Sequence, residues 1–523
     1  MWGIFFTKAL QVTTYLIIFP FTGLALSYYI TLILGWYKSP KSSFHTILEL
    51  FHLSPSGIHP KEVAIRGTSG IVTEIFGGSS GPEGPSAIFG AGLATYLFKK
   101  LRISIEPGKA LLVGVAAGIS AVFKTPLTGL MFALELPYRQ DLDKDVFMEA
   151  AIASCAAYLV SYLLGTPSLL PRIAQGTGMM EMYMIPYAIG FGSLIGLASL
   201  IFTRLFDIGE KIAKRLSSIG GYPLMLMIGG LALGFIGLSK PEALGPGFHL
   251  IPFISNASFY ALVSLFSFKL VATVLTFSFG GSGGTFLPVL YIGALWGAIF
   301  GMVVNPALVP LFVLMGMAGF TAGVHKMMIT PIILIAESYG SNNLIPIILV
   351  TVVTYFIAGN YRFFPIQPKS KIIEEELALE RFYYKIKNNP PKALFSVKAI
   401  DIMTPRPVTL DEELTIRTAL EVFISTTYRV LPVVTKEQAV VGYVTLEDLA
   451  AQPLKMLDSP LGLIEIKRAF IVSENDAMLQ VIENMIDSKD NRCFIVDVEE
   501  HLVGVISTID VTRLLLKYYT NNG

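Results

Sequence analysis

The sequence predicts an all-α membrane-spanning domain built from broken helices, followed by a smaller soluble α+β region. Three observations carry this prediction. Of the 523 residues, 53% are hydrophobic and only 15% are charged, against about 25% charged in a typical soluble domain. In the stretch Leu270–Tyr361 the only ionisable Asp, Glu, Lys, Arg or His residues are His325, Lys326 and Glu337. After Arg362 the sequence becomes polar, with alternating runs of Lys and Glu.

Charge-free stretches identify the first helices that cross the membrane. About 20 apolar residues span a bilayer, and Tyr15–Leu34, Met182–Thr203 and Leu216–Ser239 each meet this length without a charged residue. Ionisable side chains in hydrocarbon cost several kcal/mol each, which explains their absence. The first stretch lacks a small-residue cleavage site, so we expect a retained helix and not a signal peptide.

The other apolar segments are too short or too interrupted to be simple spanning helices. Irregular backbone at bilayer depth is tolerated only where it is buried in protein or lines a cavity. Helices broken in this way are typical of transporters and channels, where half-helix ends bind ions. The segments broken by glycine or proline are Gly67–Gly81, Pro85–Phe98, Ala110–Phe123, Pro126–Pro137, Pro288–Val303 and Thr330–Ser338.

Two segments about 200 residues apart repeat one pattern. Ala117–Glu135 and Ala318–Glu337 each contain Ala-Gly, a helix of small residues, a lysine, a break, and a Thr seven residues before the final Glu. One extra residue in the second copy reconciles the lengths. We interpret the pair as a duplicated, inverted architecture, although apolar helices also resemble each other by chance. We expect the two glutamates to be structural, and the two lysines either to attract anions or to snorkel towards the interface.

Each half of the repeat also has a glycine-rich break that opens a helix, at Gly77–Ser86 and at Gly280–Pro288. Glycine permits the sharp turn, and the free N–H groups and dipole of a helix N-terminus attract an anion. Neither break ends in the Gly-Lys-Ser/Thr of a phosphate-binding loop. Close packing of glycines is the alternative. Glu83 stands in the first break, where an ionised carboxylate would compete with an anion, unless it merely stabilises its helix.

These residues resemble the CLC family of chloride channels and proton/chloride exchangers. Gly81-Pro-Glu-Gly-Pro85 resembles the family's Gly-Arg-Glu-Gly-Pro, and Gly283-Gly-Thr-Phe-Leu-Pro288 its Gly-Gly-Ile-Phe-Ala-Pro. Thr125-Pro-Leu-Thr-Gly129 matches a third motif, which the second copy carries with Met328 in place of proline. The resemblance covers residues 1–365. It implies a homodimer with one anion pathway per subunit and Glu83 as the gate. The implied anion site comprises Ser42, Gly81, Gly84, Gly284, Thr285, Phe286 and Phe364.

Several positions depart from the family pattern. The inner-gate serine is assigned to Ser42 within Lys41-Ser-Ser-Phe-His45, with Ser39 and Ser43 as alternatives. Phe364 replaces the pore tyrosine, for which Tyr361 is the other candidate. Arginine beside the gate is replaced by Pro82, and the second carboxylate of a Glu-Glu pair by Leu136. Since leucine cannot carry protons, the departures slightly favour passive, channel-like chloride conduction over the alternative, proton-coupled antiport.

Residues 366–394 are predicted to be a linker, and residues 395–523 a soluble module with two copies of one pattern, 395–452 and 460–518. Each copy is predicted to contain an entry strand, a helix, a strand, a turn, a second strand and a second helix. The strand before the turn is Arg429-Val-Leu-Pro-Val-Val434 in the first copy and Cys493-Phe-Ile-Val-Asp497 in the second. The pattern resembles a tandem pair of CBS domains. The resemblance implies a possible adenine nucleotide held by a hydroxyl and a carboxylate from each copy. These residues are Thr445, Asp448, Ser507 and Asp510, with plain helix capping as the alternative role of the hydroxyls.

Other functional classes find little support in the sequence. No Ser-His-Asp motif or phosphate loop suggests an enzyme, and a net charge of +1 recruits no nucleic acid. The two cysteines form no disulfide scaffold or metal cluster, and His45, His52 and His59 are too widely spaced for one metal. We therefore expect no metal site. A CBS-regulated transporter of another ion is the second alternative. The expected location is a membrane with a cytoplasmic tail, and the expected partners are chloride, protons and lipid.

Overall fold

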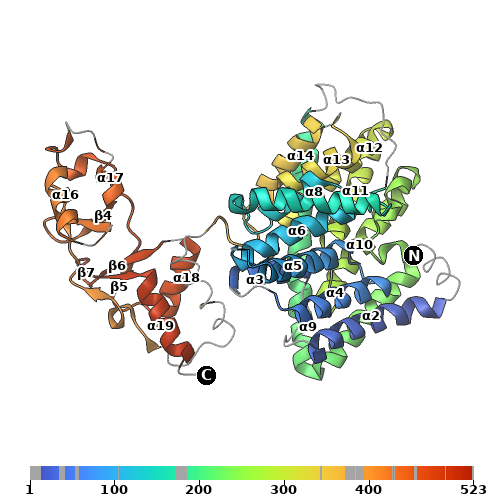
Figure 1. Ribbon diagram of the computed structural model, residues 1–523, viewed down its shortest axis with the longest axis horizontal. Helices are drawn as coiled ribbons and strands as arrows, with labels where there is room; N and C mark the ends of the chain where they lie inside the picture. Colours follow the sequence, from blue (N-terminus) through green and yellow to red (C-terminus); the bar gives the residue numbers. More distant parts are fainter. Residues whose placement is uncertain are drawn as a thin grey trace. The chain divides into compact units, whose positions relative to one another are not determined.

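The computed structural model describes residues 13–34, 42–53, 58–103, 105–171, 185–341, 344–371, 383, 394, 396–426, 428, 430–450, 452, 456–488 and 490–520. The chain divides into two compact units, residues 1–371 and 372–523, and the division falls inside the predicted linker. Figure 1 shows helices throughout the first unit and two small sheets with helices in the second.

The first unit consists of helices of very different lengths. The α-helices are α2 (Thr13–Leu34), α3 (Ser43–Leu53), α4 (Pro60–Ile75), α5 (Glu83–Lys100), α6 (Pro107–Phe123), α7 (Pro126–Glu135), α8 (Phe147–Leu163), α9 (Ile185–Ser239), α10 (Phe259–Ser278), α11 (Phe286–Val304), α12 (Val309–His325), α13 (Ile329–Tyr339) and α14 (Leu344–Ile357). Short 3₁₀ helices are η1 (Lys144–Val146), η3 (Pro241–Ala243), η4 (Phe248–Asn256) and η5 (Pro306–Leu308).

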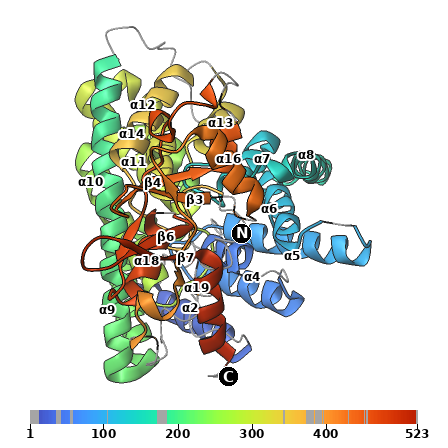
Figure 2. The same ribbon diagram turned by 90° about the vertical axis from the view of Figure 1, so that its left-hand side faces the viewer.

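Within the described residues, five helical segments are long and apolar enough to cross a membrane. They are Lys144–Leu163, Ile185–Ser239, Phe259–Ser278, Phe286–Val304 and Pro306–His325. The 55-residue α9, which extends along one side of the first unit in Figure 2, is two helices joined at a kink. The kink lies at Gly220 and Gly221, where φ reaches 70°. Two of the segments expected to be broken, Pro126–Pro137 and Thr330–Ser338, form the short helices α7 and α13. The expectation is wrong for Pro288–Val303, which lies inside the continuous helix α11, one of the five long apolar segments.

The outer surface of the first unit is apolar. Tyr260 is 84% exposed, Leu163 81% and Ile345 79%. In water such a surface would be unfavourable, whereas lipid accommodates it. By contrast, α12 is buried along almost its whole length and packs against α11. A Cβ atom at Gly297 would lie 2.0 Å from the carbonyl oxygen of Phe312, so the close approach of these two helices requires glycine.

The internal repeat is present as two helix pairs, α6–α7 and α12–α13. The break in each pair is a lysine in the left-handed region, with φ 59° at both Lys124 and Lys326. The extra residue of the second copy therefore falls before the lysine, inside α12. Glu135 at the end of α7 caps the N-terminus of α13, and Glu337 in α13 caps the N-terminus of α7. This reciprocal arrangement is that of an inverted pair, as the sequence predicts.

The second unit contains two small sheets that follow the predicted repeat. The first copy consists of β2 (Leu410–Asp411), α16 (Ile416–Ser425), β3 (Val430–Val434), β4 (Val440–Thr445) and α17 (Leu446–Ala450). The second consists of β5 (Ile471–Ser473), α18 (Met478–Ser488), β6 (Arg492–Val496), β7 (Leu502–Ser507) and α19 (Thr508–Thr520). In both copies a parallel strand pair precedes an antiparallel hairpin, β2–β3–β4 and β5–β6–β7.

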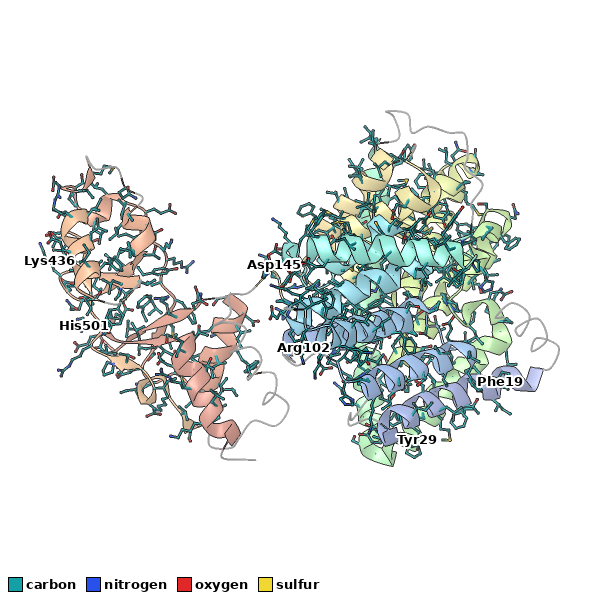
Figure 3. All side chains as sticks on the ribbon, viewed as in Figure 1. Phe19, Tyr29, Arg102, Asp145, Lys436 and His501 are labelled. Atoms are coloured by element: carbon teal, nitrogen blue, oxygen red, sulfur yellow. The ribbon has the colours of Figure 1, made fainter. Side chains whose placement is uncertain are left out.

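The two copies are also tied to each other. The short strand β1 (Thr404–Pro405), which precedes the first copy's sheet, pairs antiparallel with β7 of the second copy. The hairpin turns lie side by side where Lys436 and His501 are labelled in Figure 3, and a bridge between Ala439 and His501 joins them. The two copies therefore form one compact module instead of two independent domains.

Candidate anion site

The two glycine-rich breaks and the start of α3 meet inside the first unit. Gly81 and Gly284 exchange backbone hydrogen bonds of 2.9 and 3.0 Å, and the Ser43 N–H donates to the Gly283 carbonyl over 2.9 Å. Helices α3, α5 and α11 begin at Ser43, Glu83 and Phe286, next to these bridges. Three helix N-termini therefore lie close together, which is an arrangement suited to an anion.

Glycine is required at these positions because backbone and a carboxylate approach so closely. A Cβ atom at Gly84 would lie 2.3 Å from the Gly284 nitrogen. At Gly81 it would lie 2.0 Å from Oε2 of Glu83, and at Gly284 it would lie 2.1 Å from Oε1 of the same residue. The Glu83 carboxylate thus fills a space that exists only because two glycines, one from each half of the chain, face it.

Glu83 is fully buried. Its Oε1 accepts a hydrogen bond of 3.1 Å from the Leu287 N–H in the first turn of α11, whereas Oε2 has no hydrogen-bond partner among the described residues. The carboxylate of one half therefore uses the helix N-terminus of the other half. An anion bound to α11 would compete with Glu83 for the same N–H group.

Hydroxyl groups fix the glycine-rich loops in place. Ser80 Oγ donates to the Ser282 carbonyl over 3.0 Å, and the Ser282 N–H donates to Thr73 Oγ1 over 3.0 Å. The Ser79 N–H donates to Thr276 Oγ1 over 2.9 Å. Because buried loops need partners for their polar groups, these bonds hold the N–H groups of the site in fixed directions before any ion arrives.

The structure places both serine candidates that it describes beside the site. Ser42 Oγ accepts from the His45 N–H over 3.3 Å, so it caps α3, and the buried Ser43 hydroxyl has no hydrogen-bond partner among the described residues. Ser39 lies outside the described residues. Of the two aromatic candidates, Tyr361 donates its hydroxyl to Asp207, whereas Phe364 is buried.

Sequence reasoning missed two polar groups near the site. His325 Nε2 lies 3.1 Å from Thr285 Oγ1, and its ring centroid is 5.6 Å from that of Phe286. Arg66, whose side chain is 4% exposed, donates to Thr46 Oγ1 over 2.9 Å in the first turn of α3. The only sequence signal was a histidine in an otherwise nearly charge-free stretch. The arginine gave none.

The repeat glutamates are helix caps, as expected. Both oxygens of Glu135 are bonded, to the N–H groups of Met328, Ile329 and Thr330 and to the Thr330 hydroxyl, at 2.6–2.7 Å. Glu337 bonds the N–H groups of Leu127 and Thr128 at 2.9 and 2.7 Å. Carboxylates at helix N-termini stabilise the helix through these bonds and through its dipole.

The caps lead to a stability prediction. We expect Glu135→Gln to lower the free energy of unfolding by about 2 kcal/mol, because an amide cannot accept all four bonds and leaves buried donors unpaired. Glu337→Gln, at a half-buried site, should cost less. Thermal unfolding of the purified proteins measures both effects. If Glu135→Gln unfolds at the wild-type temperature, the carboxylate is not a structural cap.

The two matched lysines do not face a common vestibule. Lys326 Nζ donates to the Ala358 carbonyl over 2.9 Å, at the C-terminus of α14, where a cation is favoured by the helix dipole. Lys124 Nζ lies 6.0 Å from the ring centre of Tyr162, and this lysine makes no comparable helix cap among the described contacts. The structure thus favours anchoring roles over anion attraction.

In the second unit, the four predicted nucleotide residues form two helix caps. The Thr445 N–H donates to Asp448 over 3.0 Å and the Asp448 N–H donates to Thr445 Oγ1 over 3.1 Å. Ser507 and Asp510 are paired in the same way, at 2.9 and 3.4 Å. Each pair forms a reciprocal capping box. The hydroxyls therefore have the helix-capping role that is the alternative to binding a nucleotide.

The Asp448 carboxylate is also paired with Lys467 over 2.8 Å. Partial burial opposes ionisation, but the bonds from Lys467 and Thr445 outweigh it and hold the pKa of Asp448 below its ordinary value of 3.8. Because the folded pKa is lower than the unfolded one, this cap stabilises the fold above pH 3.8. The contribution is lost as the pH falls through the lowered pKa.

The fold and site together define a class: a polytopic membrane protein whose inverted repeat brings broken helix N-termini to one buried carboxylate. Residues 23–359 match the model of the voltage gated chloride channel family, and residues 397–454 and 464–517 each match the CBS domain. The chain therefore belongs to the voltage gated chloride channel family and carries two CBS domains. The family resemblance expected from the sequence is confirmed, and the family is one of transport proteins, not enzymes.

Curated relatives include exchange transporters. The H(+)/Cl(-) exchange transporter ClcA of Klebsiella pneumoniae is 30% identical over 306 residues, covering 53% of this chain and 63% of the relative. ClcA of Vibrio cholerae serotype O1 is 28% identical over 288 residues, covering 52% of this chain and 60% of the relative. The matched region thus spans less than two thirds of the length of these relatives.

Solved structures share the fold. A CLC-type fluoride/proton antiporter has a TM-score of 0.61 at 24% identity and covers 71% of this chain and 92% of its own. A eukaryotic CLC transporter has a TM-score of 0.60 at 15% identity and covers 97% of this chain and 93% of its own. The second likeness therefore extends over both units.

Proposed function

We propose that this chain transports chloride across a membrane in exchange for protons, with Glu83 as the gate. The observation that carries the proposal is the position of the Glu83 carboxylate, which lies against Gly81 and Gly284 and accepts from the N–H of Leu287. Departures such as Leu136 slightly favour passive conduction on sequence grounds. The relatives, which are named exchangers, favour the alternative, and we adopt it.

The gate follows from competition for one set of donors. Ionised Glu83 occupies the N-terminus of α11 and excludes chloride. Once protonated, it loses the attraction to the N–H groups, swings away and leaves the place to the anion. Because chloride entry requires a protonated carboxylate, each passage of the anion is linked to the binding of a proton, and antiport follows if the proton is released on the opposite side.

Chloride itself would be held without a full positive charge. The donors are the N–H groups of Phe286 and Leu287, once the Glu83 carboxylate has left them, and a hydroxyl of Ser42 or Ser43. The dipoles of three helices add to this attraction. Partial charges allow an anion to lose its water shell without being trapped. All these groups come from one chain. We include in the proposal that two chains form a homodimer with one pathway in each subunit. We also include that the second unit lies in the cytoplasm.

Purified protein in liposomes tests the proposed function. With an outward chloride gradient and no proton gradient, an exchanger moves protons uphill, and the reversal potential fixes a ratio of protons to chloride. Chloride flux without proton movement at any voltage would instead establish passive conduction. Absence of chloride flux from a folded protein would contradict the assignment of chloride as the transported ion.

We also propose that the CBS pair binds an adenine nucleotide weakly, because its hydroxyls and carboxylates must leave their caps to bind it. ATP titrated into the full-length protein should give a saturable signal in calorimetry. Asp510→Asn should weaken binding about tenfold, the loss of about 1.4 kcal/mol expected for a charged hydrogen bond to a ribose hydroxyl. Glu499→Gln, on the exposed turn of the same copy, is the control. If Asp510→Asn binds ATP like the wild type, the capping box has no further role.

A further inference from the structure

His325 lies in the centre of the first unit. It is the last residue of α12 and is 1% exposed. Its Nε2 is 3.1 Å from Thr285 Oγ1, and its Nδ1 is buried without a hydrogen-bond partner among the described residues. The centroids of Phe286 and Phe364 lie 5.6 and 5.8 Å from the centroid of its ring. The imidazole is thus placed between the loop that opens α11 and the residue that replaces the pore tyrosine.

No carboxylate of the repeat is available to carry protons in this region. Both oxygens of Glu135 are occupied by four donors from Met328 and the first turn of α13. Glu337 is bonded in the same way to α7. Leu136 has no ionisable group. Exchange nevertheless requires a route by which protons reach the buried Glu83 from the far side of the site, and a second titratable group can provide it.

We infer that His325 carries protons to Glu83 through Thr285; the inference rests on the proposed exchange. A proton binds at Nδ1 of the neutral ring. The Nε2 proton then passes to Thr285 Oγ1, while the hydroxyl releases its own proton to the Glu83 carboxylate. This carboxylate rests on the neighbouring Gly284, is bonded to the Leu287 N–H, and must move to Thr285 to accept the proton. One proton enters and one leaves, so the imidazole ends neutral and the hydroxyl is restored. Rotation of the ring resets the tautomer.

The charges around the imidazole suit this role. The ammonium group of the next residue, Lys326, is bonded to the Ala358 carbonyl. An ionised Glu83 across Gly284 attracts the proton.

Helices α11, α14, α13 and α9 pack against α12. The other titratable or charged residues on these helices, on α3 and in the segment after α14 are Tyr291, Tyr355, Glu337, Tyr339, Tyr187, Arg204, Asp207, Glu210, Lys211, Lys214, Arg215, Tyr222, His45, Glu49, His52, Tyr361, Arg362, Lys369 and Lys371.

The test compares proton and chloride movement in liposomes for the full-length wild type, His325→Gln and His325→Glu. Glutamine keeps a hydrogen bond to Thr285 but cannot carry a proton. We expect it to retain chloride flux within about threefold while uphill proton movement falls at least tenfold. Glutamate, which is titratable, should restore at least a third of the proton movement. The control is His52→Gln, a buried histidine bonded to the Pro137 carbonyl, whose proton-to-chloride ratio should equal that of the wild type.

The outcomes separate this inference from the proposed function. If the wild type moves chloride but no protons, exchange itself fails. If the wild type is an exchanger and His325→Gln keeps its proton-to-chloride ratio, the relay is overturned and exchange stands. A purely structural histidine would lower both fluxes together in His325→Gln and His325→Glu alike, and that result also overturns the relay.

Discussion

Glu83→Ala should move chloride at the wild-type rate or several-fold faster, with no coupled proton movement and no dependence on pH. Alanine cannot reach the Leu287 N–H, so it neither competes with the anion nor binds a proton. Uphill proton movement should therefore fall by at least tenfold, to the level of empty liposomes. Chloride efflux measured from pH 5 to pH 8 should change little in the variant, whereas it should fall with rising pH in the wild type.

Glu83→Gln and Glu74→Gln make the comparison specific. Glutamine imitates the protonated gate in shape, so it should also uncouple protons. Glu74, at the end of α4, is near enough to Glu83 for their charges to interact. We expect its neutral variant to stay coupled. A Glu83→Ala protein that is folded but does not conduct chloride would show that this carboxylate supports the loops and is not a gate.

Local sequence patterns predicted the parts of the site that depend on backbone geometry. Glycine and proline at Gly81-Pro-Glu-Gly-Pro85 dictate a turn that ends in a helix N-terminus, whatever the tertiary structure. The same holds for the break before Phe286. The inverted repeat was also visible, because a helix, a lysine and a capping glutamate recur at nearly constant spacing. Helix caps follow local rules, so Glu135 and Glu337 were correctly expected to be structural.

Local sequence patterns did not predict the contacts between segments that are distant in the chain. The bond between Thr285 and His325 joins residues 40 positions apart, and a lone histidine in an apolar helix has no local pattern that names its partner. The pairing of β1 with β7 across the two CBS copies is similarly nonlocal, since a two-residue strand carries almost no hydrophobic signal. The lysines in the left-handed region, Lys124 and Lys326, were recognised as matched but not as turn residues, because their type does not demand that conformation.

The contrast between Gly81→Ala and Gly84→Ala tests how the two halves of the site are joined. A methyl group at Gly81 would meet the far end of the Glu83 side chain, 2.0 Å from Oε2, and a side chain can move. A methyl group at Gly84 would lie 2.3 Å from the Gly284 nitrogen and 2.6 Å from the Gly283 carbonyl carbon, which are fixed backbone atoms. The same chemical change therefore displaces the Glu83 carboxylate in one case and separates the two glycine-rich loops in the other.

We expect Gly81→Ala to remain folded, to conduct chloride and to lose at least tenfold in proton coupling, much as Glu83→Ala does. Gly84→Ala should lose at least tenfold in chloride flux and about 3 kcal/mol in stability, the upper part of the range for overpacking. Chloride efflux, proton movement and thermal unfolding measured on both proteins distinguish the cases. Gly190→Ala, in α9, serves as a control for the methyl group because nothing lies within 4 Å of that position. Equal loss of chloride flux in Gly81→Ala and Gly84→Ala would mean that the Glu83 carboxylate cannot move out of the anion site. That result would contradict the role of Glu83 as a gate, because a gate must move for ions to be exchanged.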